Sequence, residues 1–147
     1  MHIDRDLLAA LSSDQKKWLA RAITGIIVVD GIVDKSEMEY LKEAIGFLEN
    51  EEEINDLVSQ VKERICPPLG YLEINHRLAA RLLMNLAQIT IVDGKFSQQE
   101  AEYLKEIGAK MKVGGKFVQQ VLTWIHTVLE VHKLEKDLLK KADNPLF

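Results

Sequence analysis

Apolar residues recur at intervals of three and four along most of the chain, which is the spacing of amphipathic α-helices. The clearest example lies between Ser12 and Asp30, where the apolar positions are Trp18, Leu19, Ala22, Ile23, Ile26 and Ile27. A stripe this wide predicts a central helix that is buried over much of its surface. The same spacing elsewhere predicts an all-α fold with six main helices and a short leading helix from Asp4 to Leu11.

Polar residues mark where these helices begin and end. Gly31 and Gly94 each follow a helix, where we expect the left-handed backbone that glycine adopts without strain. Pro67 and Pro68 are expected to end the helix that Asn50 begins. A capping residue followed three positions later by Glu or Gln predicts a capping box at four helix starts: Ser12 with Gln15, Asp34 with Glu37, Asn50 with Glu53, and Ser97 with Glu100.

One segment of the chain occurs twice. The sequence DGIVDKSEMEYLKE, from Asp30 to Glu43, recurs 63 residues later as DGKFSQQEAEYLKE, with eight of fourteen positions identical. The similarity extends without a gap, so that residues 19–65 align with residues 82–128. This duplication predicts two pseudo-symmetric three-helix units, at about 13–66 and 74–133, that share one core within a single domain spanning residues 1–147.

The same alignment predicts which residues of the last helix face the core. We expect the apolar stripe of the helix that Asn50 begins to recur in the final helix, which runs to about Lys141. The matched pairs are Ile54 with Phe117, Val58 with Val121, Val61 with Trp124, and Ile65 with Val128.

Composition and charge place the chain among soluble globular proteins. Of its 147 residues, 47% are hydrophobic and 29% are charged, and the net charge is -4. Residues 30–56 carry ten acids against two lysines, and residues 105–141 carry eight lysines against four acids. No aromatic residues interleave these lysines as in a nucleic-acid groove, so we expect no nucleic-acid partner.

The compartment follows from the single cysteine and from the apolar runs. Cys66 allows no internal disulfide, which fits a reducing compartment, and we expect a buried or half-buried thiol rather than a nucleophile. The N-terminal residues lack the apolar core of a signal peptide, and the longest apolar run is too short to cross a bilayer. We therefore expect a cytoplasmic protein that is not itself transmembrane.

Two aspartates have no complete structural explanation. Asp30 and Asp93 each follow the C-terminal end of a predicted helix, where the helix dipole disfavours a carboxylate by roughly 0.3–1 kcal/mol. A divalent cation would offset this cost, because Asp30, Asp34 and Glu37 supply the oxygen ligands that Ca²⁺, Mg²⁺ or Mn²⁺ prefers. In the second copy Asp93 and Glu100 remain, but Ser97 replaces the middle acid. The alternative is that these acids serve only in turns and helix caps.

The duplicated motif resembles a known family. An apolar helix running into D-G-x-hydrophobic-[D/S]-x-x-E-x-x-x-L, found twice in about 150 residues, is similar to the tellurite-resistance TerB-like domain, which also resembles the helical segment of membrane-anchored J-domain co-chaperones. The resemblance covers Trp18 to Val128. It implies a compact helical domain of two halves that serves as an interaction module in stress-linked or membrane-proximal assemblies. It also implies a divalent-metal site at Asp30, Asp34, Glu37, Asp93 and Glu100.

The sequence is therefore compatible with three functions. We expect a non-enzymatic TerB-like module that binds a divalent cation and presents an acidic surface to an unidentified protein partner. The alternative is a pure protein-interaction domain without metal. An enzyme using paired carboxylates as acid and base is a third hypothesis, but the sequence contains no HExxH, CxxC, GxSxG or dinucleotide fingerprint.

Overall fold

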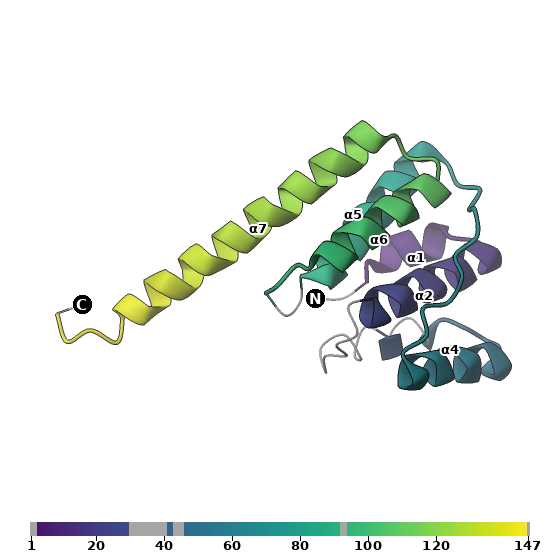
Figure 1. The fold of residues 1–147 in the computed structure, drawn as a ribbon, viewed down its shortest axis with the longest axis horizontal. Coiled ribbons are helices and arrows are strands. Elements are labelled where there is room, and N and C mark those ends of the chain that lie inside the picture. The colour runs from purple at the N-terminus through teal and green to yellow at the C-terminus, as the bar shows by residue number, and fades with distance from the viewer. Residues whose placement is uncertain (1–2, 30–40, 43–45, 92–93, 147) are drawn as a thin grey trace.

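The computed structural model describes residues 3–29, 41–42, 46–91 and 94–146, and all regular structure in these ranges is helical (Figure 1). This confirms the all-α prediction. The second helix expected in the first unit, from Asp34, lies mostly outside the described residues. The described helices are α1 (Arg5–Ala10), α2 (Ser13–Val28), α4 (Glu51–Glu63), α5 (His76–Thr90), α6 (Gln98–Lys110) and α7 (Gly115–Lys141).

Side-chain caps begin these helices largely as the sequence predicts. Of the three predicted boxes whose residues are described, two are formed, at Ser12 with Gln15 and at Ser97 with Glu100. In α4 only the first half of the predicted box forms, because the Asn50 side chain accepts hydrogen bonds from the backbone N–H groups of residues 52 and 53. The Glu53 carboxylate instead pairs with Lys17 of α2 at 3.2 Å. Glu53 therefore links α4 to α2 rather than completing the capping box of α4.

The core lies where α2 and α5 meet. Helix α2 packs against α4, α5 and α6, and α5 packs against α1, α6 and α7. Both helices carry apolar residues around more than half of their circumference, so they can be covered on several sides. The largest side chains with almost no exposed surface include Ile23, Ile26, Ile27, Leu82, Leu83, Leu86, Leu104 and Ile107.

The linker between α4 and α5 is held at several points along its length. The Trp18 indole N–H donates to the Gly70 carbonyl, with 2.7 Å between the two heavy atoms. The backbone N–H of Leu72 donates to the Lys110 carbonyl at 2.9 Å, and the Gln15 side chain donates to the Glu73 carbonyl at 3.0 Å. The linker is thereby fastened to α2 on one side and to the end of α6 on the other.

The end of α4 differs from the prediction. The helix ends before the two prolines, at Arg64, whose φ of 57° is left-handed. The backbone N–H of Ile65 then donates to the Gln60 carbonyl at 2.8 Å, which satisfies one of the last carbonyls of the helix. This turn carries Ile65 away from the core, and its side chain is 47% exposed. The prediction that Ile65 faces the core is therefore wrong.

The core face of α7 agrees with the predicted one in part. Of the four predicted residues, Val121 is buried, Trp124 and Val128 are partly buried and pack against the core, and Phe117 is 36% exposed. The other buried residues of α7 are Val118, Leu122 and Ile125, each of which directly follows a predicted position. The centre of the buried face therefore lies further around the helix than the alignment predicts.

Helix α7 extends well beyond the helices on which it packs (Figure 1). Its residues from Glu130 to Lys141 are all exposed. The prediction that the final helix runs to about Lys141 is confirmed.

Gly94 adopts the left-handed conformation that its position predicts, with a φ of +80°, and its N–H donates to the Ile91 carbonyl at 3.0 Å. We expect Gly94→Val to lower the free energy of unfolding by at least about 1 kcal/mol, because a β-branched residue is strained at this φ. Urea denaturation followed by circular dichroism measures the change. Gly70→Val is the control, because Gly70 has no left-handed φ and a Cβ there meets open space. Equal losses in both variants would contradict the argument from strain.

Candidate functional site

Of the five predicted metal ligands, the structure describes Glu100. Its side chain is only 5% exposed, and its Oε1 accepts a hydrogen bond from the Ser97 backbone N–H at 3.0 Å. In return the Ser97 hydroxyl oxygen accepts a hydrogen bond from the Glu100 backbone N–H at 3.1 Å. Glu100 therefore has a structural role at the start of α6. The other four predicted ligands, Asp30, Asp34, Glu37 and Asp93, lie outside the described residues.

Gly94, the glycine of the second Asp-Gly turn, lies beside α7. The Lys136 ammonium nitrogen is 3.7 Å from the position that a Cβ on residue 94 would occupy. Two residues along, the ring of Phe96 meets the ring of His126 edge to face, with 5.8 Å between centroids. A positive charge therefore lies beside the C-terminal end of α5, where it complements the helix dipole. Within the described ranges, no group of three or more His, Cys, Asp or Glu side chains is placed to hold a metal ion.

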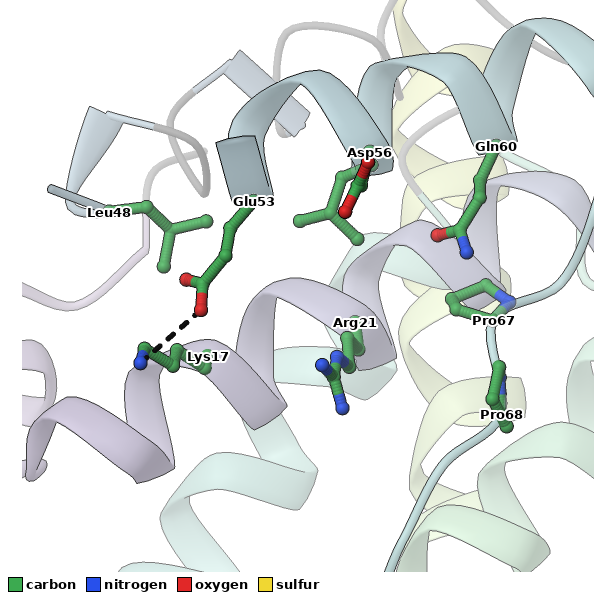
Figure 2. A pocket seen from close by; sticks show the side chains of 9 residues that line it. Lys17, Arg21, Leu48, Glu53, Asp56, Gln60, Pro67 and Pro68 are labelled. Carbon is green, nitrogen blue, oxygen red and sulfur yellow. Dashed lines mark ion pairs between the residues drawn. The ribbon is translucent and has the colours of Figure 1, made fainter. Parts of the chain in front are cut away.

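A cleft runs between α2 and α4 (Figure 2). The Lys17 and Glu53 side chains point toward one another across it. Its volume is about 190 Å³. The lining residues are Lys17, Arg21, Leu48, Glu53, Asp56, Leu57, Gln60, Pro67 and Pro68.

A second hollow, of about 490 Å³, adjoins this cleft and shares three of its lining residues, Lys17, Leu48 and Glu53. Together they form a groove along the α2–α4 face, which we call the α2–α4 groove. Acids dominate the helix on one side of it, since α4 carries five acids against Lys62. A shallow groove with charged walls suits the side chains of a protein partner better than an enclosed substrate.

The α2–α4 groove has only a weak signal in the sequence. Lys17 and Arg21 are four residues apart on α2, and Glu53 and Gln60 are seven apart on α4, so each pair lies on one face of its helix. Charged residues beside an apolar stripe are also what an ordinary solvated face carries. Only the packing of α2 on α4 shows that these faces meet across a groove.

Cys66 lies on the surface beside the buried Tyr103. Partial burial raises the pKa of the Cys66 thiol, and the nearby Glu106 carboxylate raises it further. Burial also raises the pKa of the Tyr103 hydroxyl, with the Cys66 thiol and Glu106 adding to the effect. A thiol with a raised pKa stays protonated at neutral pH and is a poor nucleophile. Cys66 is more exposed than the sequence predicts.

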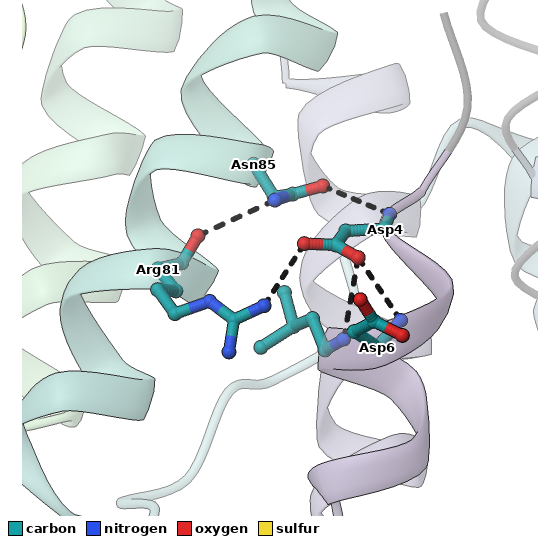
Figure 3. Close-up of polar contacts among 5 residues, drawn as sticks. Asp4, Asp6, Arg81 and Asn85 are labelled. Carbon is teal, nitrogen blue, oxygen red and sulfur yellow. Dashed lines mark hydrogen bonds and ion pairs between the residues drawn. The ribbon is translucent and has the colours of Figure 1, made fainter.

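A polar cluster joins α1 to α5 (Figure 3). The Arg81 guanidinium donates to the Asp4 carboxylate at 2.9 Å, and the Asp4 backbone N–H donates to the Asn85 side chain at 3.4 Å. The hydrogen bond from Arg81 is the largest cause that lowers the pKa of Asp4, and bonds from the first N–H groups of α1 lower it further. The cluster caps α1 and fastens it to α5, which gives it a structural role.

The fold defines an all-helical protein in the ranges that the structure describes. None of the helices there combines the length and the apolar character needed to cross a bilayer. Comparison with protein-family models, with curated proteins and with solved structures finds no match. The resemblance to the TerB-like family therefore stays a prediction that rests on the duplicated motif.

Proposed function

We propose that the protein is a non-enzymatic, TerB-like helical module that binds a divalent cation at its Asp-Gly turns and a protein partner on its acidic face. The observation that supports this most is the geometry of the second turn. Gly94 is left-handed, and the Ser97–Glu100 capping box follows it directly. The acids of this motif are oxygen ligands of the kind that Ca²⁺, Mg²⁺ or Mn²⁺ prefers.

The first turn is the stronger candidate of the two. It contains three acids, Asp30, Asp34 and Glu37, within eight residues. The second turn has lost the middle acid, its Glu100 carboxylate accepts a backbone hydrogen bond, and the Lys136 ammonium lies beside it. A fixed positive charge opposes a cation there. We therefore assign the tighter cation site to Asp30, Asp34 and Glu37, with a weaker site at Asp93 and Glu100.

A pure interaction domain is the second candidate, and Glu100 and Lys136 favour it. If the first turn repeats this arrangement, its acids act as caps and as counter-ions of lysines. The α2–α4 groove and the acids of α4 would then carry the whole function, by recruiting a partner with basic side chains. The membrane-proximal or stress-linked setting and the cytoplasmic location belong to the proposal through the family resemblance.

The test is calorimetric titration of chelator-treated protein with Ca²⁺, Mg²⁺ and Mn²⁺. We expect heat from at least one ion and at least about tenfold weaker binding in Asp30→Asn, because a carboxylate ligand is lost. The thermal midpoint of metal-free Asp30→Asn should not fall, since removing a negative charge after a helix C-terminus relieves an unfavourable interaction with the dipole. The matched control is Asp137→Asn, which removes one exposed acid from α7.

Glu100→Gln separates ligation from capping at the second turn. Glutamine can replace glutamate in a capping box, so the variant should keep its stability. Weaker cation binding in this variant would assign Glu100 to a metal site. If none of the three ions gives heat on titration into the wild-type protein, the cation site is ruled out. The interaction domain then remains as the function.

A further inference from the structure

A hollow of about 220 Å³ opens where α5 and α7 begin and α6 ends. This is the end of α7 opposite its projecting half (Figure 1). The walls come from the start of α5, the turn between α6 and α7, and the first turn of α7. The lining residues are His76, Ala80, Lys112, Val113, Gly114 and Phe117. The hollow shares no residue with the α2–α4 groove, so it is a separate surface of the protein.

Half of the residues that line this hollow are apolar and still in contact with water. Phe117 is 36% exposed, and Ala80 and Val113 are only partly buried. An apolar side chain that entered the hollow would remove this surface from water, as the central side chain of a protein interface does.

The surroundings of the hollow are basic. Lys112 lines it, and Arg77 and Lys116 are next in sequence to the lining residues of α5 and α7. All three side chains are exposed, and none forms an ion pair with a described residue. The segments that meet at this end of the bundle, residues 74–91 and 107–129, contain five Lys and Arg residues and no Asp or Glu. The charge that complements this surface is therefore negative.

Lys112 is held in place by the turn that ends α6. Its backbone is left-handed, with a φ of 58°. Its N–H donates to the Ala109 carbonyl at 3.0 Å, and the Val113 N–H donates to the Gly108 carbonyl at 2.9 Å. Glycine is the usual residue at such a position, because it adopts this backbone without strain. The chain instead has a lysine there, on the wall of the hollow.

We propose that this hollow and its basic surroundings bind an acidic segment of a partner protein. One apolar side chain of the segment fills the hollow beside Phe117, and carboxylates on either side of it lie near Lys112 and Lys116. A small anion would use the cations but leave the apolar wall exposed to water. Single-stranded nucleic acid favours cations that follow a groove with several aromatic side chains, whereas the cations here surround one hollow.

Nuclear magnetic resonance of the isotope-labelled full-length protein tests the site, because amide signals report binding as weak as about 1 mM. The probe is a synthetic peptide with one leucine between two pairs of aspartates. We expect the amide signals of residues 76–80 and 112–117 to shift as the peptide is added. A peptide with serine in place of the leucine should bind at least about fivefold more weakly, because the apolar contact is lost. A peptide with asparagines in place of the aspartates should also bind more weakly, and added salt should weaken the original peptide.

Two variants remove binding without a loss of stability. Lys112→Gly removes a cation and also relieves the left-handed backbone, so it should melt no lower than the wild type. Gly114→Asp introduces a negative charge on the wall, where a Cβ meets no atom within 4 Å. Aspartate is a preferred N-cap residue, so this variant should be at least as stable as the wild type, yet it should bind the peptide at least about tenfold more weakly. Lys133→Gln is the control, because it removes one exposed lysine from the projecting half of α7.

The outcomes separate the proposal from its alternatives. Absence of shifts at residues 76–80 and 112–117 with about 1 mM peptide would overturn it, as would equal binding of the leucine and serine peptides. Binding by Lys112→Gly and Gly114→Asp that matches the wild type would also overturn it. Inorganic phosphate that shifts the same signals at a lower concentration than the peptide would assign the hollow to a small anion. The same result with a single-stranded oligonucleotide would assign it to nucleic acid.

Discussion

Gly25→Ala is expected to lower the free energy of unfolding by about 3 kcal/mol, at the upper end of what overpacking a core costs. Gly25 lies in the last turn of α2, where the Tyr103 ring from α6 rests directly on its backbone. A Cβ at this position would overlap the Tyr103 hydroxyl and the adjacent ring carbons. Both residues are buried, so the ring has no free space to move into, and α2 and α6 must separate. Urea denaturation at equilibrium measures the loss.

Two variants separate this clash from the helix propensity of glycine. Gly46→Ala is the control, because Gly46 is helical and exposed and a Cβ there meets no atom within 4 Å. Its stability should be unchanged or slightly higher. Tyr103→Leu removes the atoms that clash, so Gly25→Ala should cost much less in that background than in the wild type. Additive effects of the two substitutions would show that the ring does not press on residue 25.

Trp18→Ala is the second large effect, with an expected loss of about 3–5 kcal/mol in the same measurement. The Trp18 side chain is buried, and its indole N–H holds the linker at Gly70. Trp18→Phe should cost about 1 kcal/mol, because it keeps most of the apolar volume and loses mainly the hydrogen bond. Trp124→Ala should cost clearly less than Trp18→Ala, since Trp124 is only partly buried. Equal losses at the two tryptophans would contradict the expectation that the partly buried Trp124 contributes less to stability than the buried Trp18.

Local features of the fold can be predicted from the sequence because their causes lie within a few residues. The capping boxes at Ser12 and Ser97 depend on side chains three residues apart, and the left-handed Gly94 depends on its place after a helix. The apolar spacing also identifies α2 and α5 as the central helices. In each case one short segment contains all the atoms that decide the outcome.

Features that depend on distant contacts are predicted less well. The register of α7 is set by its packing on α5 and α6, which buries Val118, Leu122 and Ile125 and leaves Trp124 only partly buried against the core. The close approach of Tyr103 to Gly25 joins residues far apart in the chain, although an isolated glycine inside a helical pattern is a signal for such a contact. The Glu53–Lys17 ion pair likewise needs the packing of α4 on α2.

At the candidate metal site, too, local features could be predicted from the sequence and distant contacts could not. The role of Glu100 as a cap follows from its spacing to Ser97, and the structure confirms it. The place of Lys136 beside Gly94 could not be predicted, because Lys136 comes from the far part of the longest helix.

The linker between α4 and α5 has a consequence for how the protein unfolds. Trp18 and Gln15 fasten it to the first half of the chain, and the Lys110 carbonyl fastens it to the second. Unfolding of either half therefore releases the linker, on which the other half also depends. Since α2 and α5 also share their buried faces, the two halves should melt in one cooperative transition rather than as separate subdomains.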